Sequence, residues 1–167
     1  MIQLEALTLG YGQQILLDQA SANLDKGGLI ALLGRNGSGK SSLLRAIAGL
    51  GTIRSGRILL AGRDLAELQP EKRARIVSFV TTEKVRIPNL KCRDVVALGR
   101  APYTNWVGHL QPQDREIIDK SLALLDMASY AERTMDQMSD GECQRIMIAR
   151  ALAQDTPIIL LDEPTSF

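Results

Sequence analysis

Residues 34–41 read Gly-Arg-Asn-Gly-Ser-Gly-Lys-Ser and match the pattern G-x-x-x-x-G-K-[ST]. The glycines would let the chain curl tightly around a phosphate group, because they carry no Cβ atom that could clash. A helix that begins directly afterwards would point its N-terminal amides and the positive end of its dipole at the same anion. The pattern therefore predicts a site for nucleotide phosphates. The residues expected to form it are Gly34, Asn36, Gly37, Ser38, Gly39, Lys40, Ser41 and Ser42.

Two side chains of this loop have roles that follow from their chemistry. The Lys40 ammonium can reach the β and γ phosphates of a nucleotide, and the Ser41 hydroxyl can bind Mg²⁺. A second pair of candidates follows the apolar run 158–161. Asp162 could hold Mg²⁺ through water at the carboxyl end of a predicted strand, and Glu163 stands where a base could orient an attacking water. Two acids after an apolar strand are by themselves a weak indication of a catalytic site. Together with the phosphate loop, they indicate the second half of a nucleotide site.

Strands and helices must position these side chains. The apolar run 29–33 precedes the glycine-rich loop and predicts a strand buried on both faces, as in the centre of a parallel sheet. Residues 41–49 have helical spacing and end in glycine, and residues 158–161 predict a second apolar strand. Further strands are expected at 2–7, 15–22, 56–61 and 75–80, and further helices at 94–100, 113–127 and 139–154. This order favours an α/β sheet with a helical insertion.

The composition is that of a globular protein. Of 167 residues, 45% are hydrophobic and 23% charged, and 20 Lys and Arg face 19 Asp and Glu. This balance excludes collagen-like, low-complexity and disulfide-rich chains, and the net charge of +1 argues against coating nucleic acid or membrane through bulk charge. The length predicts one domain. Cys92 and Cys143 are interpreted as structural thiols in a reducing compartment. No run approaches the roughly 20 apolar residues of a membrane span, so we expect a cytoplasmic protein.

Four motifs follow one another along the chain as they do in one family: Tyr11, the phosphate loop, residues 139–145 and residues 162–166. Residues 139–145, Ser-Asp-Gly-Glu-Cys-Gln-Arg, resemble the signature sequence of ABC-type ATPases, usually written LSGGQ or LSGGE. Residues 162–166 are similar to the Walker B motif and the start of the D-loop in that family. Tyr11 occupies the place of the aromatic that stacks on adenine, and the alternative is a strand-end aromatic packed on the core. Residues 98–103 and 113–115 resemble the ATPase subunits of iron-siderophore, haem and cobalamin importers.

The resemblance implies an α/β fold of the P-loop NTPase type. It would have a RecA-like core, an antiparallel β subdomain at the N-terminus and an inserted helical subdomain at about residues 83–155. Residues 1–167 would form a single ABC-type ATP-binding domain that is incomplete at its C-terminus, because the family's D-loop aspartate and switch histidine lie beyond Walker B. The implied activity is hydrolysis of ATP with Mg²⁺, coupled to uptake of an iron chelate, haem or cobalamin, with this short chain poorly active.

The resemblance also implies partners. Two copies would form a head-to-tail homodimer, with each ATP between one phosphate loop and the signature residues Ser139, Gly141 and Glu142 of the partner subunit. Membrane-spanning permease subunits would hold the dimer on the inner face of the plasma membrane, and no nucleic acid is expected. Tyr103 and Trp106 could dock such a subunit or pack locally. Two other classes stay open: a non-transport ABC ATPase in DNA repair, translation or cofactor assembly, and an ATP-binding module with little turnover.

Two positions depart from the family's pattern. Thr82 stands where the family has its Q-loop glutamine and is too short to reach both magnesium and water, a role that Glu83 could take. Asp140 replaces the first glycine of the signature. At 6 Å its carboxylate would repel a γ-phosphate by roughly 3 kcal/mol per unit charge at an effective dielectric constant of 20. The alternative is that Asp140 points away and caps the helix that begins near Ser139. Both substitutions suggest slow or partner-dependent hydrolysis.

Overall fold

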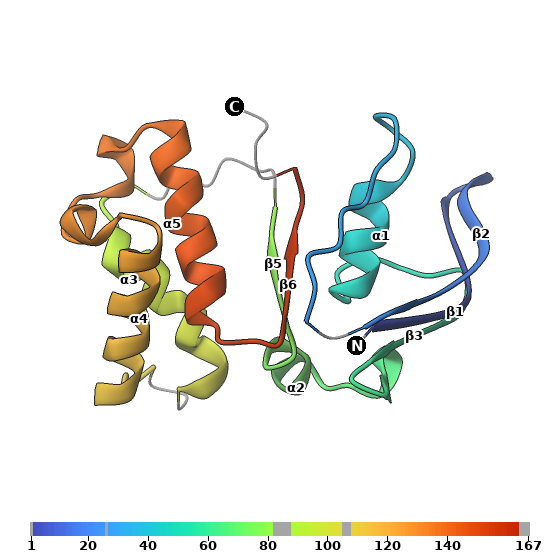
Figure 1. Ribbon diagram of the computed structural model, residues 1–167, viewed down its shortest axis with the longest axis horizontal. Helices are drawn as coiled ribbons and strands as arrows, with labels where there is room; N and C mark the ends of the chain where they lie inside the picture. Colours follow the sequence, from blue (N-terminus) through green and yellow to red (C-terminus); the bar gives the residue numbers. More distant parts are fainter. Residues whose placement is uncertain (1, 26, 82–87, 105–107, 164–167) are drawn as a thin grey trace. The chain divides into compact units, whose positions relative to one another are not determined.

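The computed structural model describes residues 2–25, 27–81, 88–104 and 108–163, and they fall into two units, 1–76 and 77–167 (Figure 1). Each unit has its own sheet and its own buried residues. Thr82, Glu83 and Trp106 lie outside the described residues, as do residues 164–166 after Walker B. The organisation as one domain with a helical subdomain at about 83–155 stays a prediction.

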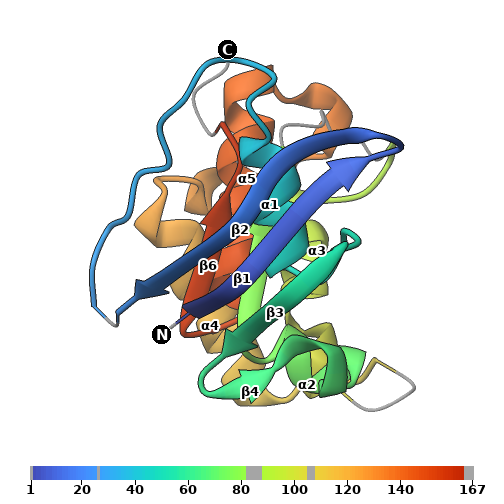
Figure 2. The ribbon, with the colours of Figure 1, turned by 90° about the vertical axis from the view of Figure 1, so that its right-hand side faces the viewer.

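The first unit is built on an antiparallel sheet in the order β2-β1-β3-β4 (Figure 2). The long hairpin of β1 (Ile2–Tyr11) and β2 (Gln14–Leu24) forms one side, and β3 (Ser55–Leu60) and β4 (Arg63–Asp64) form the other. On β1 the side chains of Leu4, Leu7 and Leu9 are buried, which confirms the strand that the apolar spacing predicts. The strands expected at 15–22 and 56–61 are likewise confirmed.

Helix α1 (Lys40–Ile47) follows the glycine-rich loop and ends near Gly49, whose φ of 69° closes the helix as the predicted glycine stop requires. The 3₁₀-helix η1 (Leu65–Glu67) and helix α2 (Pro70–Ala74) complete the unit. Ala46 of α1 and Ile58 of β3 line one small cavity of about 250 Å³, so the end of the helix lies beside the sheet. Helix α1 and strand β3 are therefore the elements that the sequence predicts after the phosphate loop, whereas β4, η1 and α2 were not predicted.

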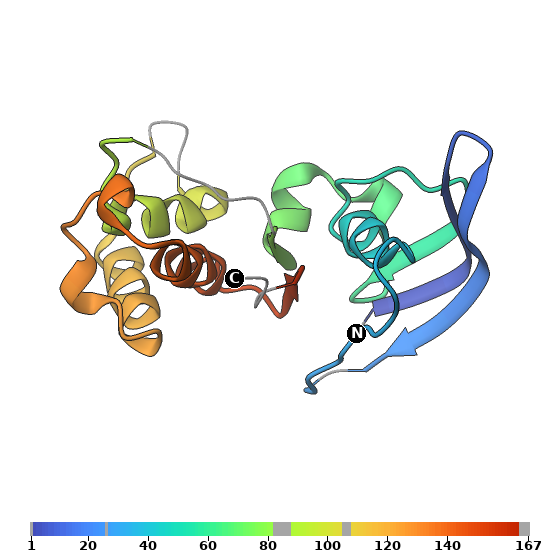
Figure 3. The same ribbon diagram turned by 90° about the horizontal axis from the view of Figure 1, so that it is seen from above.

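The second unit pairs two parallel strands with a set of helices (Figure 3). Strands β5 (Val77–Val80) and β6 (Ile158–Leu161) lie in register from Val77 opposite Ile158 to Val80 opposite Leu161. The other elements are α3 (Cys92–Ala97), η2 (Leu98–Tyr103), α4 (Pro112–Leu124), η3 (Ala128–Tyr130), η4 (Met135–Gln137) and α5 (Asp140–Ala153). The helix predicted over 94–100 begins earlier and tightens to a 3₁₀-helix that contains Pro102, which cannot continue an α-helix.

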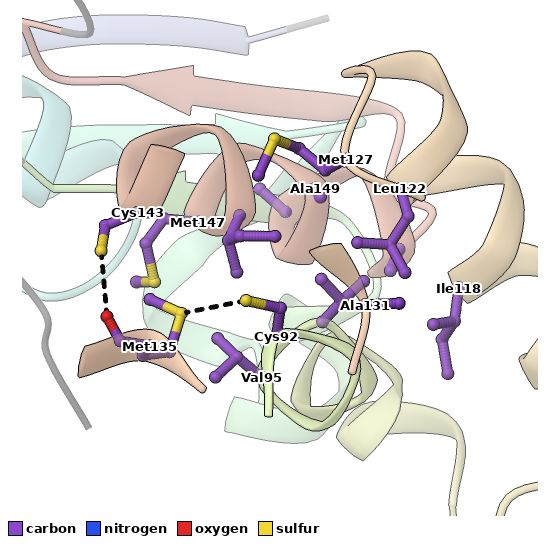
Figure 4. Packing of buried hydrophobic residues seen from close by; sticks show 14 of the residues in the cluster. Cys92, Val95, Ile118, Leu122, Met127, Ala131, Met135, Cys143, Met147 and Ala149 are labelled. Atoms are coloured by element: carbon purple, nitrogen blue, oxygen red, sulfur yellow. Dashed lines mark hydrogen bonds between the residues drawn. The ribbon is translucent and has the colours of Figure 1, made fainter. Parts of the chain in front are cut away.

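The helices of the second unit enclose an apolar core around α5 (Figure 4). Met135 is fully buried in it, with its sulfur 4.0 Å from the Cys92 thiol, and the Cys143 thiol donates to the Met135 carbonyl at 3.6 Å. Both cysteines are buried and neither forms a disulfide, as expected of structural thiols, and burial raises the pKa of Cys92. The methionines Met127, Met135, Met138 and Met147 are all buried. Among the described residues no group of three metal-ligating side chains occurs.

The prediction of a buried parallel strand over 29–33 is wrong for this structure. The segment forms no strand, and Leu29 and Leu33 are 99% and 88% exposed. A parallel strand exists only through hydrogen bonds to a neighbouring strand. Within the described part of the first unit, every paired strand belongs to the antiparallel sheet. The apolar run indicates which residues favour burial. It does not indicate whether an adjacent strand is present to form the hydrogen bonds that a strand requires.

Gly99 allows η2 to lie directly against the backbone of α5. A Cβ atom at this position would lie 2.2 Å from the Arg150 carbonyl oxygen, and backbone cannot move aside as a flexible side chain can. We expect Gly99→Ala to lower the free energy of unfolding by about 2 kcal/mol, as overpacking does. Urea denaturation measures the change. Gly28→Ala, where an added Cβ meets nothing within 4 Å, is the control. Equal unfolding midpoints for the two variants would contradict the expectation.

Candidate nucleotide-binding site

The phosphate loop has the tight curl that its glycines predict. Gly37 and Gly39 have φ values of 79° and 91°, in the left-handed region that other residues rarely adopt. A Cβ atom on Gly34 would lie 2.7 Å from the Ser38 hydroxyl. The Lys40 ammonium donates to the carbonyl of Gly34 at 3.0 Å and to that of the next residue at 2.9 Å. The lysine therefore folds back over the loop, where a cation can meet a bound phosphate.

The start of α1 is suited to an anion. Its N-cap is Gly39, no side chain caps it, and its first turn contains no acid. In contrast, each of the other α-helices in the described part of the chain has at least one acid in its first turn. A helix N-terminus without a carboxylate keeps its positive dipole end and backbone amides for another anion. Ser41 and Ser42, both predicted site residues, lie in this turn.

Tyr11 ends β1 and is 63% exposed, so it does not pack in the core as the alternative interpretation holds. The hairpin that it closes approaches the phosphate loop through β2. A Cβ atom on Gly39 would lie 3.1 Å from the Cβ atom of Leu16, two residues beyond the start of that strand. An exposed aromatic ring on this hairpin is free to stack on a nucleotide base, and adenine stacking stays a prediction.

Asp162 and Glu163 follow β6 directly, as the sequence predicts. Asp162 is 5% exposed and its backbone amide donates to the Val80 carbonyl at 3.0 Å, so it is fixed at the carboxyl end of the parallel pair. Glu163 is exposed and has a φ of 45°. A non-glycine residue in this region is uncommon and is found preferentially at functional sites. These acids belong to the second unit and the phosphate loop to the first.

The signature residues form the N-terminus of α5. Ser139 is the N-cap, and a capping box joins it to Glu142. The Glu142 carboxylate accepts from the Ser139 amide at 2.8 Å and from the Ser139 hydroxyl at 2.7 Å. Hydrogen bonds from the hydroxyl and the amide lower the pKa of Glu142. The cap is thus Ser139 and not Asp140, which is the first helical residue and places an acid at the positive dipole end. Gly141 is exposed with open space beside it.

A buried ion pair in the second unit was not predicted. The guanidinium of Arg100 donates to the Asp114 carboxylate at 2.8 Å and to the Ala153 carbonyl at 2.9 Å, and both charged side chains are 7% exposed. The Tyr103 ring lies 4.1 Å from this guanidinium, and its hydroxyl donates to Asp155. Tyr103 therefore packs locally. The signal in the sequence is an arginine within the otherwise largely apolar stretch 95–102.

The antiparallel sheet, the glycine-rich loop with its uncapped helix and the acid-ended parallel strand together define a P-loop ATP-binding cassette. The chain belongs to the ABC transporter family, whose sequence model matches residues 17–166. The predicted fold class, a P-loop NTPase with an N-terminal antiparallel sheet and inserted helices, is thereby confirmed. In the described residues, no helix is both long enough and apolar enough to cross a membrane.

Relatives and solved structures agree with this assignment. An uncharacterized ABC transporter ATP-binding protein of Methanocaldococcus jannaschii is 40% identical over 167 residues, 100% of this chain and 58% of that protein. The iron(3+)-hydroxamate import ATP-binding protein FhuC of Bacillus subtilis is 33% identical over 163 residues, 98% of this chain and 61% of that protein. A dimeric ATP-binding cassette bound to ADP and Pi has a TM-score of 0.84 at 28% identity, covering 99% of this chain and 75% of that one. This chain spans about 60% of the length of these curated relatives.

Proposed function

We propose that the protein is the ATP-binding and ATP-hydrolysing subunit of an ABC importer that takes up an iron chelate, haem or cobalamin. The observation that carries the proposal is the phosphate loop, where Lys40 lies over the glycine-rich curl and α1 begins with neither a capping side chain nor an acid. The similarity to the iron(3+)-hydroxamate import protein of Bacillus subtilis supports the iron-chelate class. A nucleotide phosphate is the anion that fits this loop and helix.

The roles of the site residues follow from their chemistry. Lys40 and the amides of the loop would hold the β and γ phosphates, with Tyr11 on the adenine ring. The Ser41 hydroxyl and the Asp162 carboxylate each offer an oxygen donor, the kind that Mg²⁺ prefers, and both would hold the metal in this proposal. Mg²⁺ would neutralise phosphate charge when bound. Glu163 would orient the attacking water and accept its proton. Thr82 would stand at the Q-loop position, where its side chain is too short to reach both Mg²⁺ and water, and Glu83 would take that role.

The proposal includes the assembly. Two subunits would associate head to tail, so that Ser139, Gly141 and Glu142 of the partner subunit face the nucleotide held by the phosphate loop. The dimeric form of the cassette bound to ADP and Pi supports the association of two subunits. The dimer would act on membrane-spanning permease subunits at the inner face of the plasma membrane. With a net charge of +1, attachment there would depend on contacts with those subunits rather than on bulk charge.

The test is phosphate release from ATP by the purified protein, with and without Mg²⁺, alongside equilibrium binding of ATP. Saturable binding with Mg²⁺-dependent release supports the proposal. Binding without release would instead favour the ATP-binding module with little turnover, for which Thr82 and Asp140, the two departures from the family's pattern, are the motivation. Absence of both binding and release would overturn the proposal.

Tyr11 is expected to set the affinity for the base. Stacking of a base on an aromatic ring is worth about 1–3 kcal/mol, so Tyr11→Ala should weaken ATP binding by roughly tenfold. Tyr11→Phe keeps the ring and should bind ATP as the unmodified protein does. Titration calorimetry with ATP and with inorganic triphosphate measures both effects. If the alanine variant loses affinity for triphosphate to the same extent, the ring does not act through the base.

A further inference from the structure

The signature serine is already committed to a hydrogen bond within its own helix. The Ser139 hydroxyl donates to Oε2 of Glu142 at 2.7 Å, and the Ser139 oxygen accepts from the Glu142 amide at 3.4 Å. A serine hydroxyl has one proton to donate and two lone pairs to accept with. While this bond is made, Ser139 can therefore offer an incoming group only a lone pair.

A terminal phosphate offers only acceptors at neutral pH when it is fully ionised. Ser139 can bind it only by donating its proton, and that proton is held by the Glu142 carboxylate. Hydrogen bonds to a charged acceptor are roughly twice as strong as neutral ones, so the phosphate must compete with a strong acceptor. The carboxylate also lies in the same turn as Asp140, which adds a second negative charge.

We propose that Glu142 is a positioning residue that keeps the Ser139 hydroxyl directed at its own carboxylate. Nucleotide binding across the dimer then requires this hydroxyl to turn from Glu142 to the terminal phosphate. This inference rests on the proposed function. The backbone half of the capping box is unaffected by the turn, because the Glu142 carboxylate still accepts from the Ser139 amide. The helix therefore keeps its start while the hydroxyl changes partner.

The variant Glu142→Gln separates the two roles of this side chain, which accepts from the Ser139 amide and from the Ser139 hydroxyl. The glutamine oxygen can accept from the Ser139 amide and preserve the capping box, but it is a neutral and weaker acceptor for the hydroxyl. We expect the variant to reach half-maximal ATP-driven dimerisation and half-maximal phosphate release at a roughly threefold to tenfold lower ATP concentration. Circular dichroism and the melting temperature should match those of the unmodified protein.

Loss of negative charge alone could also favour ATP, and two variants distinguish this effect. Asp140→Asn removes one charge from the same turn and leaves the capping box intact. Ser139→Ala removes the hydroxyl, so the effect of Glu142→Gln must disappear in the double variant if it acts through that hydroxyl. A pure charge effect would persist there and would weaken as salt is added.

The experiment measures ATP-dependent dimerisation by light scattering and phosphate release for the unmodified protein, the three single variants and the double variant. A gain in Glu142→Gln that exceeds the gain in Asp140→Asn and vanishes without the hydroxyl supports the inference. Equal gains, or a gain that survives Ser139→Ala, overturn it while the proposed function stands. If the unmodified protein shows neither ATP-dependent event, the proposed function fails, and the inference falls with it.

Discussion

Lys40→Ala is expected to lower the rate of phosphate release from ATP by at least about 100-fold, the cost of removing one preorganised charge donor from such a site. The lysine ammonium lies 3.0 Å and 2.9 Å from two carbonyl oxygens of the phosphate loop, so it is held at the position where phosphate charge would accumulate. Its removal leaves the glycine-rich curl without that cation. ATP affinity should fall as well, because in the proposed function the lysine would contact phosphate in the bound state as well as in the reaction.

A steady-state phosphate assay checks this expectation, and the urea midpoint checks that the variant is folded. The control is Lys120→Ala, which removes an exposed lysine from α4 in the second unit and should leave the rate unchanged. If Lys40→Ala retains the rate of the unmodified protein, the loop does not act on nucleotide phosphates, and the proposed function loses its principal support.

Arg100→Met is expected to lower the free energy of unfolding by about 3–5 kcal/mol, because it leaves the Asp114 carboxylate buried without its partner. The guanidinium also donates to the Ala153 carbonyl, and that bond is lost with it. The double variant Arg100→Met with Asp114→Asn should recover part of the loss. The side-chain oxygen of the asparagine at position 114 can still accept from the Gln111 amide, and the pair then contains no buried charge.

The matched control is Arg93→Met, the same change in the same unit. Arg93 pairs with Asp119 at 2.6 Å and with Glu132 at 3.3 Å, but these side chains are 40% to 66% exposed. Exposed pairs contribute between zero and about 1 kcal/mol, so this variant should unfold at nearly the original urea concentration. If the two variants lose the same unfolding free energy, burial of the Arg100 pair does not increase the cost of breaking it.

At acidic pH, Arg100→Met should lower the free energy of unfolding by less than it does at neutral pH. Burial opposes ionisation of Asp114, but the hydrogen bonds from the Gln111 amide and from Arg100 outweigh it, so the pKa of Asp114 lies below its usual value. A carboxyl with a lowered pKa contributes stability above the unfolded pKa of about 3.9, and loses it as the pH falls through the folded value. Without Arg100 the buried carboxyl protonates more readily. The difference in unfolding free energy should therefore be largest near pH 7 and narrow towards pH 4.

Local patterns predicted the parts of the site that local forces build. The curl of residues 34–39 depends on glycine conformations, and β1 follows a loosely alternating run of apolar residues. The serine and glutamate three residues apart, Ser139 and Glu142, carried the signal of a capping box. That signal identifies Ser139 as the cap, whereas one reading of the sequence gave this role to Asp140.

Features that depend on distant residues could not be predicted in the same way. The Arg100 and Asp114 pair joins η2 to the start of α4, and neither residue alone reveals its partner. Residues 29–33 have the apolar composition of a central strand, yet a strand requires hydrogen bonds from a neighbour that composition cannot specify. In both cases the missing information concerns which segments meet.

Helix α5 spans 14 residues, or about 21 Å at 1.5 Å per residue, and it is fastened at both ends. Its first turn carries the signature. Its last turn receives the Gly99 backbone and the Arg100 guanidinium, and Tyr103 bonds just beyond it. Elements η2 and α5 therefore share backbone and side-chain contacts at the end of the helix that lies opposite the signature. A displacement of η2 would act first on that end of α5.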